Sequence, residues 1–169
     1  MNSKKLVAVS LPAAAAAMAA DLNVSLEIPK MNVAEYHRPY VAMWIEKPDQ
    51  SFVQNVAVWY DVRPKGRKSG TTWLKDLRQW WRKSGRELTM PVDGVSGATR
   101  AAGSHTLSFA GAKTLAPGSY EFVIEAAREV GGRELLRVPF EWPAKRGGNN
   151  SQSAQGTTEL GAVKVTVTP

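Results

Sequence analysis

The chain has 169 residues, a formal net charge of +7 and no cysteine. Without cysteine it cannot hold an iron–sulfur cluster, a thiol nucleophile, a thiolate zinc site or a disulfide. It has two histidines, His37 and His105, and they do not predict a metal site or a haem held by paired imidazoles. A P-loop, a dinucleotide-binding fingerprint and a hydrolase nucleophile elbow are also absent from the sequence. We therefore single out no metal ligand and no catalytic residue.

The N-terminal segment has the layout of a secretory signal peptide. Lys4 and Lys5 precede an apolar stretch, residues 6–17, and small residues follow at Ala17–Ala19. A membrane-spanning helix needs about 20 apolar residues, so this stretch is too short to serve as one. We expect residues 1–19 to be removed, and we expect residues 20–169 to form a single periplasmic domain with no transmembrane segment.

The first strands are predicted from two patterns of apolar residues. Residues 22–28 alternate between apolar and polar side chains, which is typical of a strand with one buried face. Residues 40–46 and 53–60 are apolar on both faces, as expected for central strands that are covered on both sides.

A basic run follows at Arg63–Gly70. Because the chain is predicted to be exported, we do not expect nucleic acid as a partner. Two interpretations remain open. The run forms a solvated loop, or it is a docking patch for an anionic partner or for lipid headgroups. Salt would weaken the electrostatic attraction to such a patch.

Residues Thr71–Lys83 predict one short amphipathic helix at the edge of the fold. Thr71 or Thr72 is expected to cap its start. Helical spacing would bring four large side chains onto its buried face: Trp73, Leu77, Trp80 and Trp81.

The second half of the chain predicts further strands. A short strand is expected at His105–Phe109, and the Gly131–Gly132 pair predicts a hairpin. Apolar side chains alternate in three more segments, which are Tyr120, Phe122, Ile124 and Ala126, then Leu136, Val138, Phe140 and Trp142, then Val163, Val165 and Val167. Residues 143–158 are rich in Gly, Ser, Asn and Gln, so we expect a flexible polar loop there.

These elements predict a mainly β fold. Short strands punctuated by Gly, Pro and Asn favour an antiparallel two-sheet sandwich, immunoglobulin-like in outline.

One motif carries more chemical information than the rest of the chain. Residues Asp93–Thr99 read D-G-V-S-G-A-T and resemble the D-x-x-S-G-A-T acceptor site for covalent attachment of FMN. In such sites the threonine hydroxyl forms a phosphoester with the flavin's phosphate, and a separate FAD:protein FMN transferase installs it. The resemblance implies that Thr99 carries FMN and that four residues complete the motif: Asp93, Ser96, Gly97 and Ala98. The alternative is an ordinary polar turn, because Asp-Gly and Ser-Gly are common turn dipeptides.

The residue types suit this chemistry. β-Branching restricts the χ1 torsion of Thr99, and the small pair Gly97–Ala98 would let a transferase close over it. The side chains of Asp93 and Ser96 can hydrogen-bond to nearby backbone groups and hold a turn. The resemblance adds that Asp93 helps to present Thr99 to the transferase.

Four residues near the motif in sequence are candidate flavin contacts. Stacking of a nucleobase on an aromatic ring contributes roughly 1–3 kcal/mol, and a flavin ring should behave similarly. Trp80 and Trp81 are the nearest aromatic residues; we expect one to pack in the core and leave a flavin contact open for the other. Arg100 either neutralises the phosphodiester or is an exposed surface residue. His105 either hydrogen-bonds to the flavin or is structural.

A separate group of charges follows the strand that begins at Tyr120. Glu125, Arg128 and Glu129 lie close together in sequence, and we expect them to form an ion-pair network.

Several segments in this order resemble a known family. They are Arg38–Trp44 (RPYVAMW), Leu74–Trp81 (LKDLRQWW), Asp93–Thr99, and Glu125–Glu129 (EAARE) followed by Gly131–Gly132. The chain is similar to the predicted periplasmic proteins called domain of unknown function 2271. That family is associated with transferase-installed flavin and with PepSY-type membrane proteins thought to pass electrons across the inner membrane.

Three functions remain open at this point. The first is a periplasmic electron carrier with FMN on Thr99 and a membrane donor, of the PepSY type if the family association holds. The second is a cofactor-free, exported, immunoglobulin-like module for binding or assembly. The third is a flavin enzyme that reduces a small substrate directly.

Overall fold

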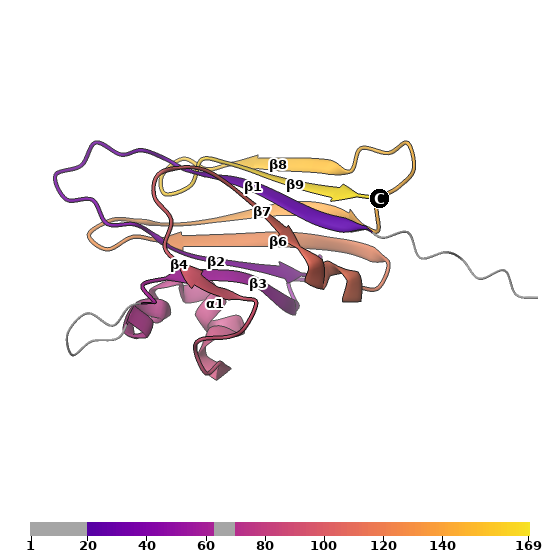
Figure 1. Cartoon of the computed structure of the whole chain (residues 1–169). Helices are drawn as coiled ribbons and strands as arrows, with labels where there is room; N and C mark the ends of the chain where they lie inside the picture. The colour runs from indigo at the N-terminus through magenta and orange to yellow at the C-terminus, as the bar shows by residue number, and fades with distance from the viewer. Residues whose placement is uncertain (1–19, 63–69) are drawn as a thin grey trace, which may run out of the picture.

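The computed structural model describes residues 20–62 and 70–169, which form a sandwich of two β-sheets (Figure 1). The predicted signal peptide and all of the basic run except Gly70 lie outside these residues. The four-stranded sheet has the order β5 (Gly103–Phe109), β1 (Asp21–Ile28), β9 (Ala162–Thr168), β8 (Ser151–Gln155). The five-stranded sheet has the order β4 (Ser96–Ala98), β3 (Phe52–Tyr60), β2 (Tyr40–Glu46), β6 (Gly118–Ala127), β7 (Arg133–Trp142). The predicted two-sheet, mainly β architecture is confirmed.

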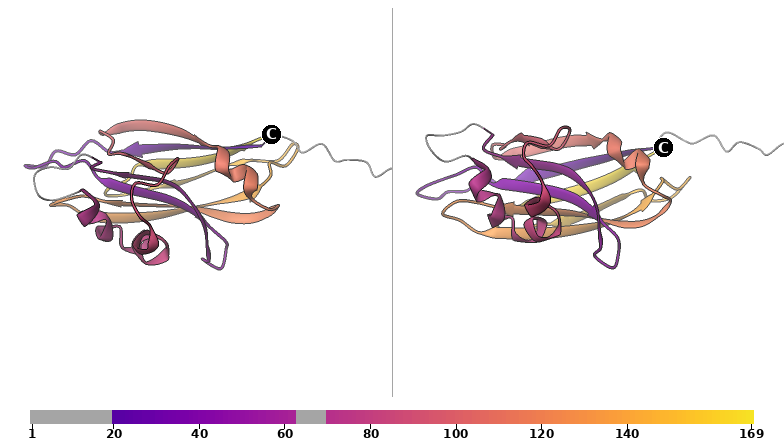
Figure 2. Two further views of the ribbon diagram at one scale, coloured as in Figure 1. Left: turned by 60° about the horizontal axis from the view of Figure 1, so that its bottom comes forward. Right: turned by 90° about the horizontal axis from the view of Figure 1, so that it is seen from below.

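Helical segments cover the outer face of the five-stranded sheet (Figure 2). They are the 3-10 helix η1 (Gly70–Asp76), the α-helix α1 (Arg78–Lys83) and the 3-10 helix η2 (Gly85–Glu87), while a further 3-10 turn, η3 (Ala110–Thr114), follows β5. Buried side chains therefore form two clusters, one between the sheets and one between the five-stranded sheet and the helical layer. This arrangement explains why residues 40–46 are apolar on both faces, because β2 is covered on both sides.

The strand patterns agree with the sequence in most places. In β1, Leu22, Val24, Leu26 and Ile28 all point into the core. The strand expected at His105–Phe109 is β5. The Gly131–Gly132 pair lies in the loop of an antiparallel hairpin, in which Ala127 of β6 pairs with Arg133 of β7.

Three expectations need correction. The sandwich is not wholly antiparallel, because β4 pairs in parallel with β3. The segment 143–158 is not a loop throughout, because Ser151–Gln155 pairs with β9 and forms β8. The single helix predicted over Thr71–Lys83 is instead divided at Leu77 between η1 and α1. As a consequence Trp73 is 43% exposed, although helical spacing placed it on the buried face.

The division of the helix has a physical cause in the sheet beneath it. The carboxylate of Glu125, on β6, is fully buried and accepts hydrogen bonds from the backbone N–H groups of Gln79 (3.0 and 3.1 Å) and Trp80 (2.8 Å). These are among the first N–H groups of α1, which have no partner within the helix. Glu125 thus caps α1 from the sheet, where a new helix starts at Arg78.

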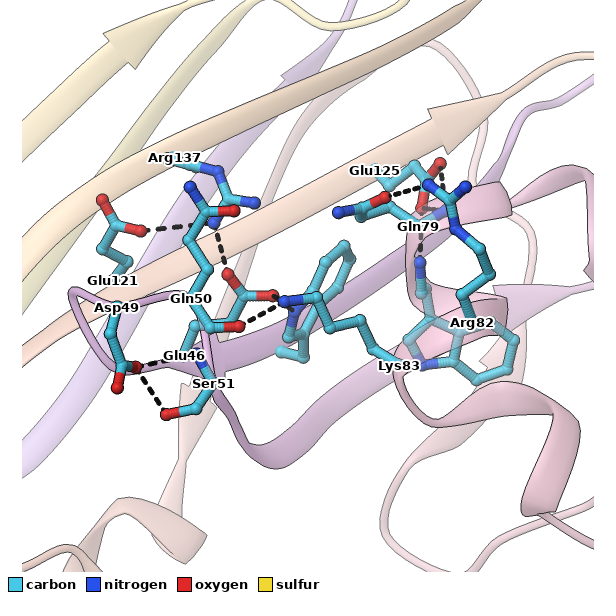
Figure 3. A network of polar contacts seen from close by, with 12 residues as sticks. Glu46, Asp49, Gln50, Ser51, Gln79, Arg82, Lys83, Glu121, Glu125 and Arg137 are labelled. Carbon is cyan, nitrogen blue, oxygen red and sulfur yellow. Dashed lines mark hydrogen bonds and ion pairs between the residues drawn. The ribbon is translucent and has the colours of Figure 1, made fainter.

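A second buried carboxylate holds the other end of α1 (Figure 3). Glu46, on β2, accepts hydrogen bonds from Arg137 and from the indole of Trp44 (2.7 Å), and it pairs with Lys83 at the end of α1 (3.1 Å). Burial acts to raise the pKa of Glu46, but these hydrogen bonds outweigh it and lower the pKa below its ordinary value. Arg137 also pairs with Glu121 at 3.2 Å. The helical layer is therefore fixed to the sheet through buried carboxyl groups at both ends of α1.

Replacing the capping carboxylate should loosen the helical layer. We expect Glu125→Gln to reduce the free energy of unfolding by about 1–3 kcal/mol, because the amide cannot accept all of the backbone N–H bonds or pair with Arg133 as a carboxylate does (2.6 Å). Glu121→Gln, on the same strand but partly exposed, is the matched control and should cost less than about 1 kcal/mol. Urea denaturation measures both, and equal losses would contradict the capping role.

A third carboxylate organises the loop between β8 and β9. Glu134 accepts hydrogen bonds from the backbone N–H groups of the loop at Thr157, Thr158, Glu159 and Leu160. Burial acts to raise the pKa of Glu134, but the backbone hydrogen bonds outweigh it and lower the pKa to about 2.

Acid should weaken the fold through this residue. The folded-state pKa of Glu134 lies below its ordinary value of 4.5, so its contribution is complete above that pH and is lost as the pH falls toward about 2. We expect Glu134→Gln to cost about 1–3 kcal/mol of unfolding free energy at pH 7 and much less near pH 2. Glu141→Gln, on the exposed side of β7, is the control. A pH-independent loss for Glu134→Gln in urea denaturation would contradict this assignment.

Candidate functional site

The motif residues form an edge strand of the five-stranded sheet. In β4, Ser96, Gly97 and Ala98 pair in parallel with Val58, Trp59 and Tyr60. Hydrogen bonds extend the pairing at both ends, since the Val58 N–H donates to the Val95 carbonyl (2.8 Å) and the Thr99 N–H donates to the Tyr60 carbonyl (3.2 Å). The backbone of Thr99 is therefore held at the end of the sheet, and the residue is half-buried.

A tight turn leads into this strand. The N–H groups of Val95 and Ser96 both donate to the Val92 carbonyl (3.2 and 2.9 Å), and the Val92 N–H donates to the Ser96 hydroxyl (2.8 Å). The expected role of Ser96 in holding a turn is thus confirmed. Gly94 has φ +72°, a left-handed conformation that glycine adopts without strain. Asp93 lies beside it and is exposed.

The two small residues before Thr99 face different surroundings. A Cβ atom at Gly97 would lie 3.2 Å from Cδ1 of Trp59, which is closer than ordinary van der Waals contact. Ala98 instead is exposed. A larger residue at position 97 would have to displace Trp59, whereas the surface at position 98 is open to another protein.

Thr99 lines a pocket at the end of the five-stranded sheet, which we call the sheet-end pocket. Its volume is about 800 Å³, within the range of roughly 300–1,000 Å³ that is typical of small-molecule sites. Four aromatic side chains line it with Thr99: Tyr36, Tyr40, Tyr60 and Trp73. Val62 and Gly70, which flank the undescribed residues 63–69, also line it.

The tyrosines at the base of the pocket are held in place. The rings of Tyr40 and Tyr60 pack edge to face, with centroids 6.4 Å apart. The Tyr40 hydroxyl donates to the Gly70 carbonyl (3.0 Å), and burial raises the pKa of Tyr40, so this residue stays protonated in neutral solution. Tyr36 and Trp73 are more accessible, at 38% and 43% exposed.

The charged side chains of the pocket do not form the network expected from sequence. Arg128 pairs with Glu159 through Nε (2.9 Å) and Nη2 (3.2 Å), and both side chains are more than nine-tenths buried. Glu129 lies 3.5 Å from His37. Glu125 points instead toward the helical layer, where it binds α1 and Arg133. The prediction that Glu125, Arg128 and Glu129 pair with one another was wrong, because each has its own partner on a different element.

One atom of Arg128 stands out. Its Nη1 is buried and has no hydrogen-bond partner among residues 20–62 and 70–169. Arg128 also lines the sheet-end pocket. An unsatisfied buried guanidinium nitrogen is uncommon in folded proteins, because such a group loses its hydration without compensation.

The aromatic residues nearest to the motif in sequence lie outside the pocket lining. Trp80 is fully buried beneath α1 and donates from its indole to Asn55 (2.8 Å), so it takes the core-packing role. Trp81 is half-buried beside it, with ring centroids 6.3 Å apart. A flavin contact by Trp81 stays a prediction that the structure does not favour, since the described pocket beside Thr99 is lined by other aromatic residues.

Arg100 and His105 also lie outside the pocket lining, around Trp59. The Arg100 guanidinium carbon is 5.2 Å from the Trp59 ring centroid, a cation–π distance. The His105 ring packs edge-on against Trp59 (5.9 Å), and its Nε2 lies 2.8 Å from the Ala101 carbonyl. Their proposed contacts with a flavin or its phosphate stay predictions, while the contacts seen here pack both side chains against Trp59 of β3.

Membrane-spanning helices and clusters of metal-ligating side chains are both absent from the described part of the chain. Within residues 20–62 and 70–169, no helix is long and apolar enough to cross a bilayer. The same residues contain no cluster of three or more His, Asp or Glu side chains placed to hold a metal ion.

Comparison with known protein families identifies the chain. A family model described as predicted periplasmic protein (DUF2271) matches residues 21–162, which is most of the chain. The chain belongs to this family. Comparison with curated proteins and with solved structures gives no match. Membership in DUF2271 confirms the resemblance drawn from the sequence, and the family description supports a periplasmic location. The family description names no activity.

The turn before Thr99 should depend on the backbone freedom of Gly94. We expect Gly94→Ala to cost about 1–2 kcal/mol, because an L-residue with a Cβ atom is strained at φ +72° even though no atom lies within 4 Å of that position. Gly94→Asn should cost less, since asparagine tolerates this conformation. Thermal or urea unfolding compares the two, and equal stabilities would show that the left-handed turn is not retained in solution.

Proposed function

We propose that this DUF2271 protein is a periplasmic electron carrier with FMN joined to Thr99 by a phosphoester. The observation that carries the proposal is the position of Thr99, half-buried and lining an aromatic pocket of about 800 Å³. A planar, largely apolar ring system suits such a lining, because stacking on aromatic side chains contributes roughly 1–3 kcal/mol per ring. The aromatic pocket beside the motif therefore supports the proposal that Thr99 carries FMN.

The attachment reaction makes defined demands on this chain. A transferase would form a bond between the Thr99 oxygen and the FMN phosphorus of FAD, break the pyrophosphate bond, and release AMP together with the hydroxyl proton. The acceptor must therefore reach the active site of another protein. The exposed Ala98 and the open turn at Gly94 allow a close approach, and the backbone bond to Tyr60 holds Thr99 in one place.

The bound flavin would supply the redox chemistry, and this chain would supply binding and electrostatics. Covalent attachment suits an exported protein, because a freely dissociating cofactor would be diluted outside the cytosol. Residues 1–19 would direct export and be removed, as their sequence predicts. The electron donor would be a membrane protein, which the family association suggests is of the PepSY type, and the acceptor is a separate partner.

A second function is also favoured by one observation. Tyr36 and Trp73 are large aromatic side chains with more than a third of their surface exposed. Such residues are enriched in protein interfaces, so the same pocket would serve a cofactor-free binding or assembly module. The two functions differ in covalent chemistry, and the next experiment separates them.

Thr99→Ala should abolish covalent flavin attachment. After co-expression with an FAD:protein FMN transferase, the unsubstituted chain should run as a fluorescent band on a denaturing gel, and Thr99→Ala should give no fluorescence above background. Thr89→Ala removes an exposed threonine ten residues earlier and should leave fluorescence unchanged. Equal fluorescence in the Thr99→Ala protein would reject the site, and no fluorescence in any variant would favour the cofactor-free module.

A further inference from the structure

We infer that Arg128 is a second, non-covalent anchor for the flavin, binding the carbonyl-bearing edge of its ring across the sheet-end pocket from Thr99. The inference rests on the proposed function, because it assigns a pose to the cofactor proposed for Thr99. It makes Arg128 a cofactor-binding residue, which neither the acceptor motif nor the family description specifies.

The first support is the placement of Arg128 and Thr99 in the sheet. Thr99 directly follows Ala98 of β4, and Arg128 directly follows Ala127 of β6. Register links these strand ends, since Ala98 pairs with Tyr60 and Ala127 pairs with Tyr40, while the two tyrosine rings touch. Three strand spacings of about 4.8 Å separate β4 from β6, so Thr99 and Arg128 lie on the order of 14 Å apart. An extended phosphoribityl chain followed by a tricyclic ring spans a distance of this order.

The second support is the unused hydrogen-bonding capacity of Arg128. Glu159 occupies Nε and Nη2, and Nη1 is left without a partner among the described residues. Gly131 packs closely against the guanidinium, since a Cβ atom added at that position would lie 2.4 Å from Cζ. Arginine offers only donors, so Nη1 requires an acceptor from outside the described residues, and Arg128 is one of the residues that line the pocket.

The pocket chemistry selects one orientation of the ring. The pyrimidinedione edge of a flavin carries two carbonyl oxygens, whereas the opposite edge carries only methyl groups. The acceptor edge therefore belongs at Arg128, and the ring surface belongs against Tyr40, Tyr60 and the more exposed Trp73. A positive charge at this edge favours the electron-rich reduced ring, so Arg128 would also raise the reduction potential.

Free riboflavin tests this pose without the covalent bond. Riboflavin has the ring and the ribityl chain but no phosphate, whose charge the exposed Arg38 would attract by itself. The Thr99→Ala protein, which has no acceptor hydroxyl, is titrated into riboflavin while flavin fluorescence is recorded. We expect saturable quenching, and we expect Arg128→Met/Glu159→Gln in the same background to weaken binding tenfold or more, as loss of a hydrogen bond to a charged group would.

The matched control separates charge from packing. Thr99→Ala/Glu159→Gln disturbs the same buried pair but keeps the arginine, so its affinity for riboflavin should stay within about twofold of the Thr99→Ala protein. Near-ultraviolet circular dichroism confirms that each variant is folded. If the Arg128→Met/Glu159→Gln protein does not fold, Arg128→Lys replaces it. Lysine can pair with Glu159 but leaves no second nitrogen for the pocket, so the same loss is expected.

The outcomes are distinct. Absence of saturable binding, equal affinity with and without Arg128, or equal loss in the Glu159→Gln control would each overturn the inference. None of these results depends on covalent attachment, which the denaturing gel measures separately. Fluorescent bands without Arg128-dependent riboflavin binding would be consistent with the electron-carrier function but would reject the proposed orientation of the flavin at Arg128. Riboflavin binding without fluorescent bands would support flavin binding in the sheet-end pocket but would reject the carrier with covalently attached FMN.

Discussion

The parallel pairing of β4 with β3 is the contact on which the site depends. Two backbone hydrogen bonds outside the strand itself, Val58 to Val95 and Thr99 to Tyr60, hold a three-residue strand against the sheet. Because the register pairs Ala98 with Tyr60, Thr99 emerges beside the tyrosines that line the sheet-end pocket. A shift of one residue would turn the side chain of Thr99 toward the other face of the sheet. The glycine at position 97 allows this close approach to Trp59.

The pocket also depends on the helical layer outside the five-stranded sheet. Gly70 and Trp73 of η1 line the pocket, and Tyr40 of β2 bonds to Gly70. The chain continues directly from η1 into α1, whose ends are held by Glu125 and Glu46 (Figure 3). Buried carboxylates are costly unless they are fully hydrogen-bonded, and both are satisfied here by donors from the helical layer and the neighbouring strands. The polar contacts beneath α1 therefore help to position one wall of a pocket that lies at the end of the sheet.

Much of the sheet architecture was predictable from side-chain patterns, because burial on one or both faces leaves a direct trace in the sequence. The alternation in residues 22–28 and the two apolar faces of residues 40–46 both identified their strands correctly. The helix was predicted less well. Its break at Leu77 is caused by Glu125, which lies 48 residues later and which an alternating pattern places on the polar face. Residues 151–155 were missed because an edge strand of Ser, Gln and Ala has no apolar signature.

The site also combines features that neighbouring residues predict with features that only the folded chain brings together. The motif and the turn held by Ser96 could be read locally. The pocket could not, because its lining combines Thr99 and Arg128, which follow β4 and β6, with tyrosines of β2 and β3 and with Trp73 of the helical layer. Trp80 and Trp81 were nearer in sequence, but they belong to α1 and pack in the cluster between the helical layer and the sheet. Trp73 could have been proposed as a pocket residue from the sequence. It was instead assigned to the buried face, because residues 71–83 were interpreted as one continuous helix.

Peptide mapping of the protein from its native host tests the central claim most directly. Trypsin should release Glu87–Arg100, a peptide with three hydroxyl side chains, Thr89, Ser96 and Thr99. Tandem mass spectrometry of this peptide measures whether it carries FMN and on which oxygen. We predict an added FMN phosphoester located on Thr99. A peptide of unmodified mass, or FMN on a different residue, would contradict the account.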